Sequence, residues 1–169
     1  MAEIFGTSSD TTLIGMAPDY VMIANKDNDR LSGDAGTDLA HDDYIRFIIR
    51  TRDDYSVKGT TKIDSVTAKA MIDRGGAIFV DVRSASEFAR EHIPGAQNIG
   101  LVADLTQEWI SEIAGKEDEV VFYCHGKRCP HSAFAAARAL GWGFKNIFYF
   151  AEGYPAWVVA GYRVEAAHQ

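Results

Sequence analysis

Short apolar runs alternate with segments of helical spacing from about residue 59 to the end of the chain. The runs at 77–82, 119–123 and 146–150 have the length and the content of β-branched and aromatic residues that buried strands show. Helical spacing is found between and around them, at 66–73, 105–114, 132–140 and 154–160. Strands that alternate with helices predict an α/β fold, in which a parallel sheet is flanked by helices on both faces.

Local signals indicate where some of these helices begin and end. Asp64 or Ser65 is a suitable N-cap for the first helix, and Gly75 follows its last turn. Ser84, followed three residues later by Glu87, forms a capping box for a further short helix. We therefore expect one helix directly before and one directly after the strand at 77–82.

Residues 1–58 have a different character, because they lack a sustained period and are rich in Asp, Asn, Ser, Thr and Gly. They carry a net charge of −5, and the remainder of the chain carries −2. Two short apolar runs lie at 12–16 and 20–24, and 41–52 has the pattern of a helix. Residues 29–38 look like one turn of an acidic Gly/Asp calcium-binding repeat, but a single copy cannot stack into a β-helix, so a polar loop is the favoured interpretation.

The division of the chain follows from this contrast. We expect residues 1–58 to be an irregular, polar and acidic N-terminal extension or linker, in part without stable structure. Residues 59–169 should form one domain, which is an ordinary length for a domain.

Overall composition excludes several classes of protein. The net charge of −7 argues against a nucleic-acid-binding surface, which needs a clustered excess of Lys and Arg. No apolar run approaches the roughly 20 residues that span a bilayer. The first residues do not show a basic segment followed by an apolar one, so we recognise no secretory signal and expect a cytoplasmic location without membrane partners.

The candidate chemistry lies after the second predicted strand, where Cys124 stands at the strand's carboxyl end. Ligands of parallel sheets bind beyond these ends. A thiol there faces the free N–H groups and the positive dipole end of the following helix, which favour the thiolate. Cations, histidines and a glycine follow within a few positions, and they predict a cradle for a thiolate, a persulfide or an oxyanion. The residues expected to line it are His125, Gly126, Lys127, Arg128, Cys129, His131 and Ser132.

Other interpretations of this loop stay open. Cys124 could be a buried structural thiol, and the two histidines could be ordinary surface residues. Zinc bound by Cys124, Cys129 and one or two histidines would suit the ligand types, but the residues are too crowded along one loop for the usual paired spacing. Cys129 is either a packing residue or a resolving cysteine that forms a disulfide with Cys124. We expect no metal and no cofactor.

Three motifs in order resemble the signatures of the rhodanese family. Residues 79–99 contain FVDVR, EF and HIPGAQNI, which look like the N-terminal signature, and residues 153–162 contain GYPAW and GY, which look like the C-terminal one. Cys124 lies between them and matches the family's catalytic cysteine. The resemblance covers about residues 60–166 and implies a rhodanese fold. It also implies ping-pong sulfur transfer through a Cys124 persulfide, from a small donor such as thiosulfate to cyanide, a thiol or a protein acceptor.

The resemblance further implies supporting roles for residues outside the loop. Asp81, Arg83, Glu87 and His92 match positions that shape and brace the site in the family.

The loop departs from the common family pattern, which has an Arg five residues after the cysteine and a Ser directly after that. Here the fifth position after Cys124 is Cys129, and the matching Ser132 comes eight residues after Cys124. The loop is therefore two residues longer, and His131 stands where Arg is usual. This Cys-x4-Cys arrangement resembles a subset of bacterial rhodanese-like proteins and leaves the donor open. Competing functions are a thiol-redox pair, an interaction module, or a phosphatase or arsenate reductase. The last is disfavoured because Pro130 stands where such enzymes have Arg.

Overall fold

The computed structural model describes residues 55–100 and 104–166 with their side chains, and the backbone of five short strands before them. These strands are β1 (Ala2–Phe5), β2 (Thr12–Ile14), β3 (Tyr20–Ile23), β4 (Arg30–Ser32) and β5 (Ile48–Arg50).

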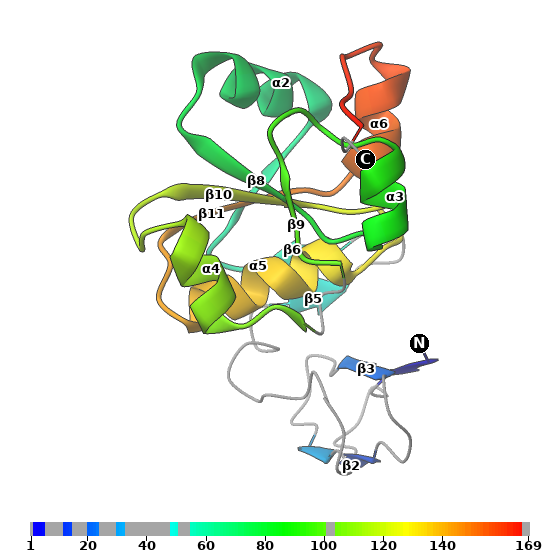
Figure 1. The fold of residues 1–169 in the computed structure, drawn as a ribbon. Helices are drawn as coiled ribbons and strands as arrows, with labels where there is room; N and C mark the ends of the chain where they lie inside the picture. Colours follow the sequence, from blue (N-terminus) through cyan, green and yellow to red (C-terminus); the bar gives the residue numbers. More distant parts are fainter. Residues whose placement is uncertain are drawn as a thin grey trace.

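A five-stranded parallel sheet forms the centre of the fold (Figure 1). Its order is β7-β11-β10-β8-β9, so the strand that precedes Cys124 is the middle one. All four pairings between neighbours are parallel. The strands are β7 (Thr61–Ile63), β8 (Ala77–Asp81), β9 (Gln97–Asn98), β10 (Glu119–Tyr123) and β11 (Asn146–Phe150).

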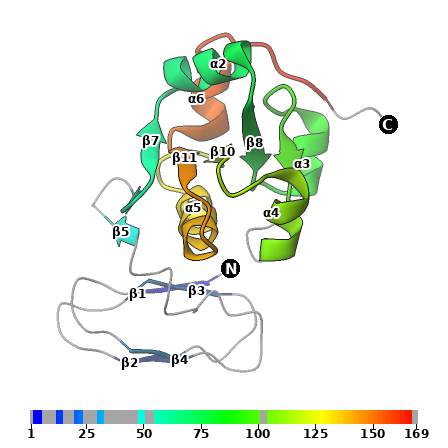
Figure 2. The ribbon, with the colours of Figure 1, turned by 90° about the vertical axis from the view of Figure 1, so that its left-hand side faces the viewer.

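Helices cover both faces of this sheet (Figure 2). One face packs against α2 (Ser65–Arg74), α3 (Ala85–Arg90) and α6 (Gly153–Val159). The other packs against α4 (Gln107–Ile113) and α5 (His131–Gly141). The α/β fold with a parallel sheet between two layers of helices is confirmed.

The middle strand shows why the sequence folds this way. Val120 and Phe122 belong to the core beneath α5, whereas Val121 and Tyr123 belong to the core beneath α2 and α6. Successive side chains of a strand point to opposite faces, so a strand covered on both sides must be apolar at every position.

Helix ends follow the local signals of the sequence. The side chain of Asp64 accepts a hydrogen bond from the N–H of Thr67 at the start of α2, and Gly75 ends the helix with a φ of 72°. The capping box of Ser84 and Glu87 is present at the start of α3.

The helix expected over 41–52 is wrong at Ile48–Arg50, which form β5. This strand pairs antiparallel with β6 (Tyr55–Val57). Two adjacent isoleucines suit a strand, because β-branched residues pack well on a pleated surface. The rest of the expected helix lies outside the described residues.

The described core reaches upstream of residue 59. Tyr55 and Val57 are buried in the core beneath α5, and the hydroxyl of Tyr149 donates a hydrogen bond to the carbonyl of Tyr55 at 2.6 Å. Most of residues 1–54, including most of the calcium-repeat-like stretch 29–38, lies outside the described residues, so the extension remains a prediction. The strands β1 to β4 pair in parallel at an offset of 18 residues, Ala2 with Tyr20 and Thr12 with Arg30.

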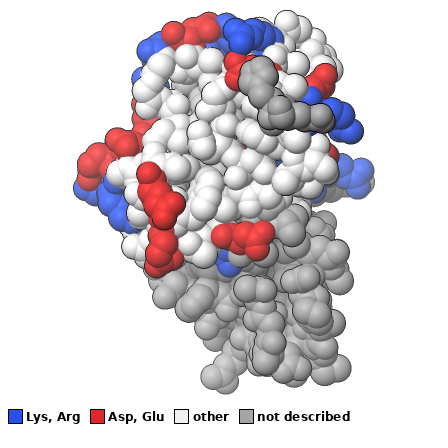
Figure 3. Space-filling model, in the orientation of Figure 1, with Lys and Arg blue, Asp and Glu red and all other residues white. Residues whose placement is uncertain are grey.

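Charge on the surface is of both signs. On the face that Figure 3 shows, the described residues have a largely uncharged centre, with acidic and basic side chains scattered around its edge. Among the described residues, none of the helices has the length and apolar content that a membrane crossing requires.

Candidate active site

Cys124 directly follows β10, at the carboxyl end of the middle strand of the sheet. Its side chain is buried, with 1% of the residue exposed. The chain turns back at Gly126, whose φ is 135° and whose carbonyl accepts a hydrogen bond from the N–H of Cys129 at 2.9 Å. This reversal brings residues five apart in the sequence together before α5 begins at His131.

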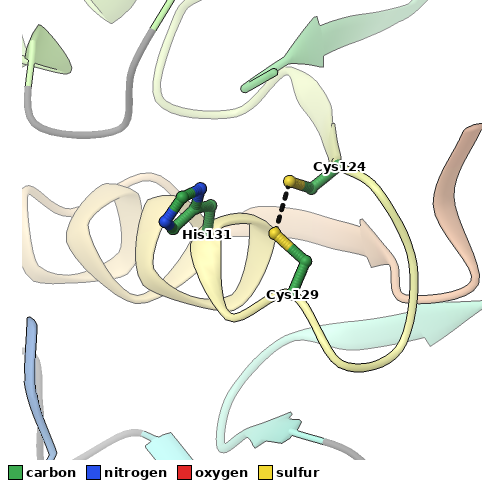
Figure 4. A group of neighbouring side chains, drawn as sticks. All are labelled: Cys124, Cys129 and His131. Atoms are coloured by element: carbon green, nitrogen blue, oxygen red, sulfur yellow. Dashed lines mark hydrogen bonds between the residues drawn. The ribbon is translucent and has the colours of Figure 1, made fainter. Parts of the chain in front are cut away.

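The two cysteines are free thiols that face each other (Figure 4). The Sγ atoms of Cys124 and Cys129 lie 2.6 Å apart. Cys129 is only half-buried, so it forms the solvent side of the pair and Cys124 the interior side. The structure thus places the second cysteine in direct contact with the first.

An imidazole contacts both sulfurs and is held from behind by a carboxylate. The Nδ1 atom of His125 lies 3.2 Å from Sγ of Cys124 and 3.8 Å from Sγ of Cys129. Its Nε2 atom lies 2.7 Å from Oε1 of Glu87. The other oxygen of Glu87 accepts a hydrogen bond from the hydroxyl of Ser84 at 2.6 Å. The capping box of α3 therefore fixes a carboxylate that orients the ring beside the sulfurs.

The ionisation of these groups reflects the same contacts. The hydrogen bond from Ser84 and the contact with His125 lower the pKa of Glu87 to about 2. Burial acts in the opposite direction but is outweighed. Burial opposes the charged form of His125, but its contacts with Cys129 and Glu87 outweigh burial and raise its pKa. An ion pair between Glu87 and a protonated His125 is thereby favoured.

The two sulfurs do not ionise equally. The hydrogen bond with Cys129, followed by burial, raises the pKa of Cys124. The pKa of Cys129 is lowered by the hydrogen bond from Cys124 and by contacts with the side chain and N–H of His131. Burial opposes these effects but is outweighed. The sequence led us to place the thiolate on Cys124. The contacts in the structure instead favour the thiolate at Cys129, chiefly because the Cys124 thiol donates a hydrogen bond to its sulfur.

The fixed cations of the loop have other partners or face solvent. Nζ of Lys127 lies 3.1 Å from Oε1 of Glu152, and 54% of its side chain is exposed. Arg128 is exposed. Ser132 is buried near the start of α5. The expected loop residues therefore lie together, but the contacts recorded at the two sulfurs come from His125 and His131.

Asp81, Arg83 and His92 brace the surrounding structure. Arg83 and Asp81 form a buried ion pair with a contact of 2.6 Å between Nη2 and Oδ2, and the guanidinium lies over the ring of Tyr154 at 3.9 Å. Nδ1 of His92 lies 2.8 Å from the carbonyl oxygen of Phe88, and the two rings stack at 3.7 Å. These contacts fix the segments on either side of the site.

A glycine in the C-terminal motif also reaches the site. Gly153 has a φ of 64°, and a Cβ atom there would lie 2.2 Å from the carbonyl oxygen of Cys124. The next residue, Tyr154, donates its N–H to that same oxygen at 2.9 Å. The sequence motif indicated that Gly153 belongs to a conserved-looking signature but not that it packs against the Cys124 backbone.

Glu87 is the second residue whose position the sequence did not reveal. Its capping box was predicted, yet its contact with His125 joins residues 38 apart in the chain. The only available signal was its place after the carboxyl end of a neighbouring strand in the same sheet.

An open cavity of about 300 Å³ lies beside the loop rather than at the sulfurs. It is lined by Lys62, Ile63, Asp64, Thr67, Lys127 and Glu152. The cavity shares Lys127 with the loop, but neither cysteine belongs to its lining.

The chain is an α/β domain whose parallel sheet carries a cysteine loop beyond its middle strand. Residues 65–160 match the family described as Rhodanese-like domain, and the chain belongs to this family.

Three known proteins illustrate the similarity. The chain is 26% identical over 125 residues to "Protein HIGH ARSENIC CONTENT 1, mitochondrial" of Arabidopsis thaliana, covering 69% of this chain and 72% of that protein. The crystal structure of the BH2092 protein from Bacillus halodurans is similar with a TM-score of 0.58 and 28% identity, covering 63% of this chain and 77% of that one. The human single-domain sulfurtransferase TSTD1 is similar with a TM-score of 0.50 and 26% identity, covering 59% of this chain and 96% of that one. Relatives of this fold thus include sulfurtransferases, and the family supports sulfur transfer or a related function.

Proposed function

We propose that the protein is a sulfurtransferase in which Cys124 carries the transferred sulfur as a persulfide. The observation that carries this proposal is the position of the Cys124 sulfur at the end of the middle strand, in contact with the His125 imidazole and the Cys129 thiol. Membership of the rhodanese family supports it. The donor is a small anion such as thiosulfate, and the acceptor is cyanide, a thiol or a sulfur-accepting protein.

The first half-reaction loads the cysteine. The Cys124 sulfur attacks the outer sulfur of thiosulfate, the bond between the two thiosulfate sulfurs breaks, and sulfite leaves with the bonding electrons. Cys129 lies 2.6 Å away and takes the proton that Cys124 gives up. The product is a Cys124 persulfide, a covalent intermediate that divides one difficult transfer into two easier ones.

The second half-reaction unloads it. Cyanide or a thiolate attacks the terminal sulfur of the persulfide, and the sulfur–sulfur bond breaks toward Cys124. The products are thiocyanate or a new persulfide, together with the regenerated Cys124 thiolate. His125, held by Glu87, supplies positive charge next to the sulfur in both steps.

In this proposal the longer Cys-x4-Cys loop determines which sulfur-donor anion the site accepts. His125, Gly126, Lys127, Arg128, Cys129, His131 and Ser132 surround the donor anion, and Asp81, Arg83 and His92 hold the loop in place. A loop with two additional residues encloses a larger anion than the common family loop does. The donor therefore extends beyond thiosulfate to larger sulfur-bearing anions.

A thiol-redox role is a second candidate, favoured by the 2.6 Å contact between the two sulfurs. In this reaction Cys129 attacks the inner sulfur of the Cys124 persulfide and hydrosulfide leaves with the bonding electrons. A Cys124–Cys129 disulfide remains, and an external dithiol must reduce it before another cycle. Because the two sulfurs are already in contact, Cys129 can reach the inner sulfur of the persulfide without a large movement of the loop.

Mass spectrometry of the intact protein separates these functions. After incubation of the reduced chain with thiosulfate, we expect the added mass of one sulfur on the wild type and on Cys129→Ser, and none on Cys124→Ser. Thiocyanate formation should be abolished in Cys124→Ser and partly retained in Cys129→Ser. Loss of two hydrogens in the wild type, with equal loss of activity in both variants, would establish the redox pair instead. A folded wild type that gains no sulfur from thiosulfate or from larger sulfane donors would refute the proposal.

A further inference from the structure

Three metal-binding side chains converge in the cysteine loop (Figure 4). Sγ of Cys124, Sγ of Cys129 and a ring nitrogen of His131 all lie within 4.8 Å of one another. Cys124 directly follows β10, Cys129 lies further along the same loop, and His131 is the first residue of α5. The crowding along the chain that argued against zinc is therefore a convergence on one point in space.

These atoms can reach the spacing that one zinc ion requires after a small side-chain movement. Zn–S bonds of about 2.3 Å and a Zn–N bond of about 2.0 Å at tetrahedral angles place two sulfurs about 3.8 Å apart and each sulfur about 3.5 Å from the nitrogen. The sulfurs lie 2.6 Å apart in the structure. They must separate by about 1.2 Å, which rotation of the half-buried Cys129 side chain can provide.

We propose that the loop binds Zn²⁺ through Cys124, Cys129 and His131 and leaves a fourth position open. Thiolates select soft cations, whereas Mg²⁺ and Ca²⁺ take oxygen ligands. Two cysteines and one histidine with an open position form a ligand set that zinc adopts in catalytic sites. Cys129 and His131 are half-buried, so the ion reaches the site from solvent on their side.

The side chains around the ligands suit this role. Nδ1 of His125 faces both sulfurs, and its Nε2 is fixed by Glu87. From this place the His125 side chain can donate a hydrogen bond to a metal-bound thiolate. Hydrogen bonds of this kind orient ligands and commonly change metal affinity by about 10- to 100-fold.

Metal and sulfur compete for one atom. Cys124 is a ligand here and the sulfur carrier in the proposed function, so an ion bound to its Sγ blocks attack on a donor. Zinc is then an inhibitor of sulfur loading, and this consequence rests on the proposed function. Binding itself does not, because the ion needs only the three ligands.

Cobalt(II) reports the site without reference to activity. The reduced full-length chain is titrated with Co²⁺ in the absence of oxygen, and the wild type should bind one ion with thiolate-to-cobalt charge-transfer bands and the visible bands of a tetrahedral site. One equivalent of Zn²⁺ should abolish these bands. Cys129→Ser and His131→Ala should each weaken binding at least tenfold, while Lys127→Gln, in the same loop but without a ligand atom at the site, should keep the spectrum.

The outcomes distinguish this inference from the proposed function. Absence of charge-transfer bands in the wild type, or an unchanged affinity in Cys129→Ser or His131→Ala, would overturn the ligand set. Sulfur loading from thiosulfate, measured by mass with and without Zn²⁺, should fall at least tenfold when zinc is present. Cobalt bands in a protein that never takes up sulfur would refute the proposed function and leave the metal site standing.

Discussion

Replacing Gly153 with alanine tests whether the start of α6 holds Cys124 in place. A Cβ atom at this position would lie 2.2 Å from the carbonyl oxygen of Cys124 and 2.8 Å from the backbone nitrogen of Gly126. Both atoms belong to the backbone of the loop, so no flexible side chain can yield. We therefore expect the substitution to displace the Cys124 loop.

The loss of stability follows from two contributions, and the loss of activity follows from the displacement of the loop. A residue other than glycine at a φ of 64° costs about 1–2 kcal/mol. Reaching an ordinary contact distance of about 3.5 Å requires a displacement of about 1.3 Å, which breaks the 2.9 Å hydrogen bond from Tyr154 to Cys124 and costs about 1 kcal/mol. The free energy of unfolding should fall by about 2–3 kcal/mol, and a displacement of about 1 Å at a reacting atom lowers the rate about 100-fold.

Gly161→Ala is the matched control. Gly161 follows the same helix and has a φ of 72°, but a Cβ atom there meets nothing within 4 Å. It should lose about 1–2 kcal/mol of stability from the backbone alone and retain activity. Urea unfolding gives the stabilities, and sulfur transfer together with the rate of thiol alkylation reports the geometry of the loop. Activity and alkylation rates in folded Gly153→Ala within threefold of those in Gly161→Ala would refute the reasoning.

Two further substitutions test the buried ion pair and the carboxylate behind His125. Asp81→Ala leaves Arg83 buried without its partner and should lower the free energy of unfolding by about 3–5 kcal/mol. The exposed i,i+4 pair of Lys69 and Asp73 is the control, since Asp73→Ala should cost no more than about 0.5 kcal/mol; equal losses in urea unfolding would contradict this contrast. Glu87→Gln should be less stable than the wild type by about 1 kcal/mol at pH 7. Because folding lowers the pKa of Glu87 from 4.5 to about 2, that stabilisation is complete above pH 4.5 and is lost as the pH falls through 2. A stability difference between Glu87→Gln and the wild type that does not change with pH would count against the contact.

The three central strands β8, β10 and β11 were predictable because they are covered on both faces, whereas the short outer strands β7 and β9 were not predicted. Burial on two sides makes β10 and β11 continuous apolar runs, and both strands begin and end where the sequence predicted, at Glu119–Tyr123 and Asn146–Phe150. Caps such as Asp64 and the Ser84–Glu87 pair involve residues three apart, so the sequence carries them as well. The pattern over 41–52 misled because apolar isoleucines at Ile48–Arg50 suit either a helix or a strand, and only pairing with β6 decides between them.

The sequence by itself placed Cys124 after a strand, in a loop with a second cysteine and two histidines, and gave the order of the family's motifs. It could do so because these are properties of neighbours along the chain. Only the tertiary structure brought Glu87 to His125 and Gly153 to the Cys124 backbone, across 38 and 29 positions of the chain. It also showed that the contacts within the thiol pair raise the pKa of Cys124 and lower the pKa of Cys129. Ionisation depends on burial and on the atoms within a few ångströms, and both depend on how the chain folds in space rather than on the order of residues alone.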